Sequence, residues 1–128
     1  MGARGIIGAG SALAVIVATL VASAVPAPAV DIQVFQFQPG AVEVRAGTAI
    51  TWTNRDDIEH TVTSGDPEHR SGRFDLRLQG HGTTTTVTFS EPGVYPYFCD
   101  RHPSMRGEIR VNSTNDSTKE STNERSER

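Results

Sequence analysis

The residues with the clearest chemistry lie in the stretch YPYFCDRHPSMRGEIRV, residues 95–111. This stretch holds the only cysteine of the chain, Cys99, followed three residues later by His102 and three after that by Met105. A thiolate and a thioether favour Cu(I), and an imidazole suits both oxidation states, so copper is the metal that this soft ligand set selects best. A second imidazole must come from elsewhere in the chain, and His60 is the leading candidate.

Other interpretations of these residues weaken when they are taken together. A lone cysteine is more often a small buried hydrophobe, and a single methionine usually fills a core. Zinc also accepts cysteine and histidine, but it prefers a hard or thiolate fourth ligand, which the thioether of Met105 does not supply. The other histidines do not join the site: His69 lies among charged residues of a polar loop, and His81 lies between two glycines in a turn.

Several short segments that must position these ligands alternate apolar and polar residues. They cover residues 31–37, 41–47, 48–54, 60–64, 73–79, 83–89, 94–99 and 107–111. Turn signals such as Pro39-Gly40 and Glu91-Pro92-Gly93 separate them, while SGDPEHRSGR, residues 64–73, is expected to be an irregular loop. Because no useful window shows helical periodicity, seven or eight strands in an all-β sandwich or barrel are predicted.

Both ends of the chain differ from this middle. Residues 1–29 carry a single charge and the apolar run ALAVIVATLVA, which predicts a secretory signal peptide cleaved after Ala24 or after Ala29. A retained N-terminal membrane anchor is the alternative, since the uncharged run is about long enough to span a bilayer. Residues 113–128 contain no apolar side chain and are predicted to be a disordered polar tail. The domain is therefore assigned to residues 30–112.

Composition excludes some classes of function. The formal net charge of −3 leaves no basic footprint for nucleic acid. A lone thiol in an exported protein would be exposed to oxidation unless it is buried, paired between chains or bound to metal. Asn112 and Asn115 each begin a weak glycosylation pattern. No His-x-His pair is present, which argues against the trinuclear centre of a multicopper oxidase.

The ligand pattern resembles the blue-copper proteins, or cupredoxins, with the amicyanins nearest and then the plastocyanins and pseudoazurins. The resemblance rests on Cys99-x2-His102-x2-Met105, on Tyr95 and Tyr97 before it, on Phe37-x-Pro39, on Gly47, on Trp52-Thr53-Asn54 and on His60. It implies a Greek-key β-sandwich and one copper ion bound by His60, Cys99, His102 and Met105. It also implies that His102 is the solvent-edge ligand through which electrons pass.

Two departures from the family pattern concern the surroundings of the site. The family commonly has Asn after the upstream histidine, bonded to a Ser or Thr after the cysteine, whereas this chain has Thr61 and Asp100. We expect an inverted pair in which the Thr61 hydroxyl donates to the Asp100 carboxylate, which would lower the reduction potential. Near His102, Arg101 and Arg106 suggest an acidic partner surface, or are merely solvated.

The sequence thus predicts an exported, periplasmic or extracellular, type 1 blue-copper protein. It would carry single electrons between redox proteins by cycling between Cu(II) and Cu(I), as a monomer that acts on no substrate and is free of the membrane after cleavage. A copper-binding carrier or buffer is the main alternative, although such proteins usually present exposed Met- or His-rich sites. A cell-surface structural domain with a vestigial site is the third, and the complete ligand set argues against it.

Overall fold

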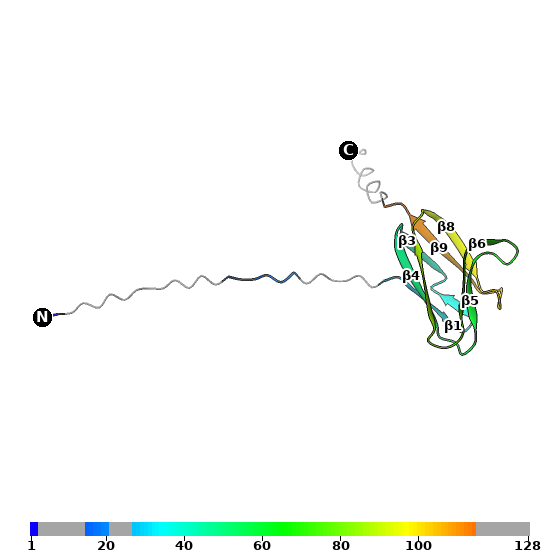
Figure 1. The fold of residues 1–128 in the computed structure, drawn as a ribbon, viewed down its shortest axis with the longest axis horizontal. Coiled ribbons are helices and arrows are strands. Elements are labelled where there is room, and N and C mark those ends of the chain that lie inside the picture. Colours follow the sequence, from blue (N-terminus) through cyan, green and yellow to red (C-terminus); the bar gives the residue numbers. More distant parts are fainter. Residues whose placement is uncertain (3–14, 21–26, 115–128) are drawn as a thin grey trace, which may run out of the picture.

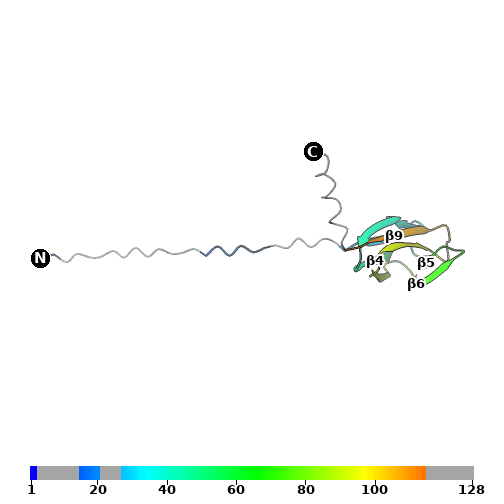
Figure 2. The same cartoon turned by 90° about the horizontal axis from the view of Figure 1, so that it is seen from above.

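The structure is a computed structural model that describes residues 1–2, 15–20 and 27–114. Its strands form two sheets that pack face to face (Figure 1, Figure 2). The first sheet runs in the order β2 (Gln36–Gln38), β1 (Ala29–Gln33), β4 (Thr48–Asn54) and β7 (Thr84–Phe89). The second runs in the order β3 (Ala41–Arg45), β9 (Arg106–Asn112), β8 (Gly93–Phe98), β5 (His60–Gly65) and β6 (Arg70–Leu78).

The Greek-key β-sandwich expected from the sequence is confirmed, and the barrel alternative is not, because the nine strands of the described residues divide between two sheets. Three pairs of consecutive strands are antiparallel, and each pair stays within a single sheet: β1–β2 in the first sheet, and β5–β6 and β8–β9 in the second. The other connections cross between the sheets, so that β1 pairs parallel with β4 and β3 pairs parallel with β9. These crossings bring segments distant in sequence to the same end of the sandwich.

Two sequence expectations about strands were wrong in detail. Residues 31–37 were expected to form one strand, but β1 ends at Gln33 and β2 begins at Gln36. The two residues between them, Val34 and Phe35, have φ angles of 52° and 56° and turn the chain back on itself. This break produces the ninth strand. The segment 64–73 was expected to be irregular, but its ends belong to β5 and β6, so only residues 66–69 connect them.

The core fills the space between the sheets with the inward-facing residues of both. Its fully or nearly fully buried members include Val30, Ile32, Phe37, Ile50, Trp52, Val62, Leu78, Phe89, Tyr97, Ile109 and Val111. Gly107 on β9 lies directly opposite Tyr97 on β8, and a Cβ atom at this glycine would overlap the tyrosine ring. This close approach packs β8 against β9 at the base of the loop that carries the predicted ligands.

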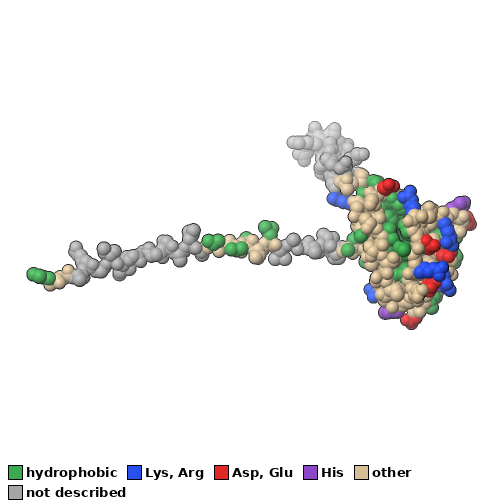
Figure 3. Space-filling model, in the orientation of Figure 1, with side chains coloured by type: hydrophobic (Ala, Val, Ile, Leu, Met, Phe, Trp, Pro, Cys, Tyr) green, Lys and Arg blue, Asp and Glu red, His purple; other side chains and the backbone are tan. Residues whose placement is uncertain are grey.

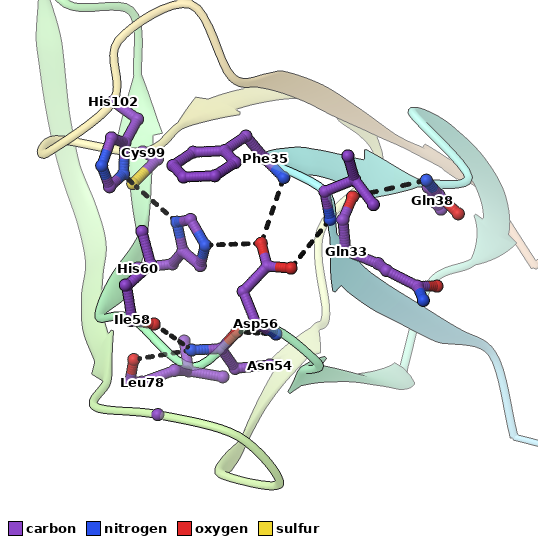
Figure 4. A network of polar contacts seen from close by, with 12 residues as sticks. Gln33, Phe35, Gln38, Asn54, Asp56, Ile58, His60, Leu78, Cys99 and His102 are labelled. Carbon is purple, nitrogen blue, oxygen red and sulfur yellow. Dashed lines mark hydrogen bonds and ion pairs between the residues drawn. The ribbon is translucent and has the colours of Figure 1, made fainter.

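The predicted ligands lie at one end of the sandwich, because the strands that carry them begin or end there. Thr63 of β5 pairs with Phe98 of β8, so the start of β5 lies beside the end of β8. His60 is the first residue of β5, and Cys99 directly follows β8. The turn between β1 and β2 reaches the same end and brings Phe35 over the imidazoles (Figure 4).

The predicted end segments are covered only in part. Most of the export segment 1–29 and of the tail 113–128, including Asn115, lies outside the described residues. Asn112, the other candidate for glycosylation, is the last residue of β9, and its side-chain amide donates a 2.5 Å hydrogen bond to Glu43. Within the described ranges, no helix has the length and apolarity needed to cross a membrane.

Candidate metal centre

The loop between β8 and β9 is closed by three backbone hydrogen bonds among its predicted ligands. The N–H of His102 donates to the carbonyl of Cys99 (3.3 Å), and the N–H of Met105 donates to the carbonyl of His102 (2.9 Å). The N–H of Cys99 donates in turn to the carbonyl of Met105 (3.2 Å). Two turns and a closing bond therefore hold the three residues in a fixed relation before any metal binds. Pro103, within the loop, removes further backbone freedom.

Three of the four predicted ligands present their donor atoms to a common space. The Nδ1 atoms of His60 and His102 lie 3.8 Å and 3.7 Å from the Sγ atom of Cys99. Their ligand atoms all lie within 4.8 Å of one another. His60 and Cys99 are fully buried, and Met105, at the end of the same loop, is 2% exposed. Two imidazoles and a thiolate with a thioether nearby are the donor set of a blue-copper site, so these residues fit copper.

The orientation of His60 is set by Asp56, which sequence reasoning did not single out. A carboxylate oxygen of Asp56 lies 2.9 Å from Nε2 of His60 (Figure 4). Burial opposes ionisation of Asp56, but hydrogen bonds from the N–H groups of Phe35 and Val34 and from His60 outweigh it, and they hold the pKa of this carboxyl below its usual range. An ionised Asp56 accepts a hydrogen bond from the N–H at Nε2 of His60. The proton is then on Nε2, so the lone pair of Nδ1 is free to face Cys99.

The expected pair between Thr61 and Asp100 is wrong in its atoms. The hydroxyl of Thr61 does connect the two ligand segments, but it accepts the backbone N–H of Asp100 (2.7 Å). The Asp100 carboxylate instead pairs with Arg70, which offsets the negative charge expected beside the thiolate. The reason is geometric, since β6 places Arg70 beside the start of the loop. The backbone N–H of Thr61 also donates to Cys99 Sγ (3.3 Å) and so stabilises negative charge on the sulfur.

The exposed edge of the site is more apolar than the sequence suggested. The Phe35 ring lies edge-on to both imidazoles, with its centroid 5.0 Å from that of His102 and 5.5 Å from that of His60, and the residue is 50% exposed. Arg101, for which the sequence left both an acidic partner and plain solvation open, donates a hydrogen bond to Glu59 (3.0 Å). On the face in Figure 3, arginines and acidic side chains are likewise intermixed.

Burial, with repulsion from His60 and Arg101, lowers the pKa of His102 and favours its neutral form.

The remaining histidines lie away from this site, as expected. His69 is in the turn between β5 and β6, and its side chain is 84% exposed. His81 is exposed in the turn that precedes β7. His69 does form a second cluster of ligand-type atoms with Asp66 and Glu68, all within 4.8 Å of one another.

Comparison with known proteins agrees with this geometry. Residues 27–112 match the profile of the copper binding proteins, plastocyanin/azurin family. The chain belongs to this family. Amicyanin-alpha of Methylorubrum extorquens is 32% identical over 88 residues, which cover 67% of this chain and 74% of the relative. Plastocyanin of Scenedesmus fuscus is 30% identical over 83 residues, which cover 59% of this chain and 85% of the relative.

Solved structures give the same assignment. A purple cupredoxin from Nitrosopumilus maritimus superposes with a TM-score of 0.61 at 28% identity, covering 66% of this chain and 99% of that one. A Cu(I) amicyanin variant superposes with a TM-score of 0.57 at 29% identity, and the match covers 70% of this chain and 86% of that one. Copper is therefore the cofactor of this family member, and the amicyanins and plastocyanins are electron carriers that act with redox partners.

Proposed function

We propose that this chain is an exported type 1 blue-copper protein that carries single electrons between redox proteins, with His60, Cys99, His102 and Met105 as the ligands of one copper ion. The observation that carries the proposal is the convergence of two Nδ1 atoms on one buried thiol. Bound copper would supply a one-electron couple between Cu(II) and Cu(I).

The role of the protein residues is to keep this donor set unchanged between the two oxidation states. The loop from Cys99 to Met105 is closed on itself, and Thr61 fixes both the thiol sulfur and the backbone of Asp100. Because the ligands need little rearrangement, electron exchange would be fast. All four ligand positions are filled by the protein, which leaves no open coordination position for a substrate. We infer a carrier and not an enzyme.

Electrons would enter and leave at His102, the only one of the proposed ligands that is partly exposed. The neighbouring Phe35 gives the partner an apolar contact, and Val34 beside it is 70% exposed. The pairing of Arg101 with Glu59 removes much of its attraction for an acidic surface. We therefore propose an apolar docking contact with donor and acceptor proteins, made by a monomer.

We further propose that a signal within residues 1–29 directs export to the periplasm or outside the cell, that residues 30–112, together with Ala29 at the start of β1, form the copper domain, and that residues 113–128 are a disordered tail. The structure bears on the cleavage point. Ala29 begins β1 and pairs with Thr51, whose N–H donates to the carbonyl of Pro28 (3.3 Å). Cleavage after Ala24 keeps these contacts, so the mass of the exported protein should correspond to a chain that begins at Val25.

The experiment that tests the function is addition of Cu(II) to purified apo-protein, followed by visible spectroscopy. We expect an intense blue thiolate-to-copper band that disappears on reduction and returns on oxidation. Absence of that band would contradict the proposal. Rapid loss of the bound copper to a chelator would instead support the copper carrier or buffer considered above.

A further inference from the structure

The turn between β1 and β2 has an unusual backbone for its sequence. Val34 and Phe35 both have positive φ, 52° and 56°, in the left-handed region that favours glycine and asparagine. A β-branched residue such as valine is particularly disfavoured there. The turn therefore needs support from outside its own two residues.

That support comes from Asp56. One oxygen of its carboxylate accepts the N–H of Val34 (2.8 Å), and the other accepts the N–H of Phe35 (3.0 Å). The second oxygen also lies 2.9 Å from Nε2 of His60 (Figure 4). A single carboxylate thus binds both the strained turn and a proposed copper ligand.

Asp56 is itself fixed from the core side. Its backbone N–H donates to the side-chain oxygen of Asn54 (2.9 Å), which is fully buried. The amide of Asn54 donates to the carbonyls of Ile58 (2.7 Å) and Leu78 (3.1 Å). The position of the carboxylate is therefore set by the framework that also leads into β5 and His60.

The turn that Asp56 holds presents Phe35 to the copper site. The phenyl ring packs edge-on against the imidazoles of both His60 and His102. Its orientation depends on the left-handed backbone at residues 34 and 35, because an extended strand through this segment would point the side chain elsewhere.

We propose that Asp56 is a positioning residue that fixes the buried ligand His60 and the exposed aromatic contact Phe35 as one unit, and that its negative charge lowers the reduction potential of the bound copper. The proposal rests on the proposed function. Carboxylates that accept the second N–H of a ligating histidine orient the ring and increase its basicity. Removal of the negative charge should favour Cu(I) over Cu(II).

The test compares Asp56→Asn with Asp57→Asn, which removes the same charge from an exposed neighbour. In the apo-proteins, nitrogen-15 NMR should show that His60 carries its proton on Nε2 in the wild type and in Asp57→Asn. In Asp56→Asn, it should show a changed tautomer or ring orientation of His60. With copper, Asp56→Asn should bind Cu(II) about 10- to 100-fold more weakly. Its potential should rise, by about 59 mV for each tenfold preference gained for Cu(I).

Loss of the turn alone could disturb folding in Asp56→Asn, so a second variant separates the two roles. Val34→Gly tolerates positive φ, and the double variant Val34→Gly/Asp56→Asn should retain the turn without the carboxylate. We expect the double variant to fold and still show the raised potential and the altered His60 resonance. If its potential and tautomer match those of Val34→Gly, Asp56 only supports the turn and the proposal is wrong.

Failure of the two proposals can be told apart. A wild-type protein without a thiolate-to-copper band would overturn the proposed function, while the apo-protein NMR would still decide whether Asp56 orients His60. A blue wild type with an equally blue Asp56→Asn variant of unchanged potential would overturn only the inference about Asp56.

Discussion

Two clusters of ligand-type side chains can be compared within this domain. His60, Cys99 and His102 form the first, and Asp66, Glu68 and His69 form the second. In each cluster the ligand atoms lie within 4.8 Å of one another. The first joins the start of β5 to the loop after β8, whereas all members of the second belong to the turn between β5 and β6.

The clusters differ in what their lone pairs already bind. In the exposed cluster, one oxygen of Asp66 accepts the N–H groups of Glu68 (3.0 Å) and His69 (2.8 Å), so it stabilises its own turn. In the buried cluster, the Nε2 of His60 contacts Asp56 and its Nδ1 faces the thiol. Proximity of ligand atoms therefore does not by itself define a metal site. A metal site also requires that water is excluded and that the ligand atoms direct free lone pairs to a common point.

The largest expected effect is loss of the blue site in Cys99→Ser. The serine hydroxyl is not a soft thiolate donor, so the charge-transfer band should vanish. Copper affinity should fall by more than the ~10- to 100-fold typical of a residue outside the ligand shell. His69→Ala is the matched change in the exposed cluster and should leave both the spectrum and the affinity unchanged. A copper affinity that depends on His69 would contradict the distinction between the clusters.

Restraint of the buried cluster by distant strands is tested by Thr61→Val. The substitution keeps the shape of the side chain but leaves the backbone N–H of Asp100 without its acceptor, which should cost about 1–3 kcal/mol of unfolding free energy. Thr86→Val is the control, because Thr86 is exposed and, among the described residues, its hydroxyl bonds to Thr51 alone, so stability should change by less than about 0.5 kcal/mol. Denaturant unfolding of the apo-proteins measures both. Equal effects would show that the partly buried hydrogen bond between Asp100 and Thr61 adds nothing specific.

Much of the buried cluster could be predicted because its loop ligands are close in sequence. Cys99, His102 and Met105 share one short loop, so their spacing reports their geometry directly. His60 required the strand pattern around it. Phe35 could not be found this way, since it meets His60 only after β1 and β5 have taken their places at the same end of the sandwich. Asp56 lies only four residues before His60, but the sequence does not say which of the neighbouring acidic residues, Asp56, Asp57 or Glu59, faces the imidazole.

The strand pattern failed where the local signals were missing. Val34 and Phe35 turn the chain without a glycine or asparagine, and the bonds from Asp56 that permit this come from more than twenty residues away. The start of β6 was missed for another reason. It is an edge strand, and residues 70–73 are all exposed, so they carry no apolar alternation. Burial on one face is what makes a strand visible in sequence.

A smaller effect on the buried cluster is expected from Met105→Leu. Leucine keeps the volume of this buried side chain, so stability should change by less than about 1.5 kcal/mol. Loss of the thioether removes a weak axial donor and leaves an apolar surrounding, which disfavours Cu(II). We expect a blue protein whose potential is higher by about 59 mV for each tenfold shift towards Cu(I), with a smaller change in Cu(II) affinity. Voltammetry and copper titration measure the two quantities. An unchanged potential would show that Met105 is only core.

The smallest effect should come from the exposed cluster and should involve acid, not metal. Hydrogen bonds from the N–H groups of His69 and Glu68 hold the pKa of Asp66 below its usual range. A carboxyl with a depressed folded pKa stabilises the fold above its unfolded value, near pH 4, and this contribution is lost as the pH falls further. Asp66→Asn should therefore flatten the decline of stability below about pH 4 by a small amount. Acid unfolding of the apo-proteins, followed by circular dichroism, tests this, and a metal-dependent shift at Asp66 would instead make the exposed cluster a second binding site.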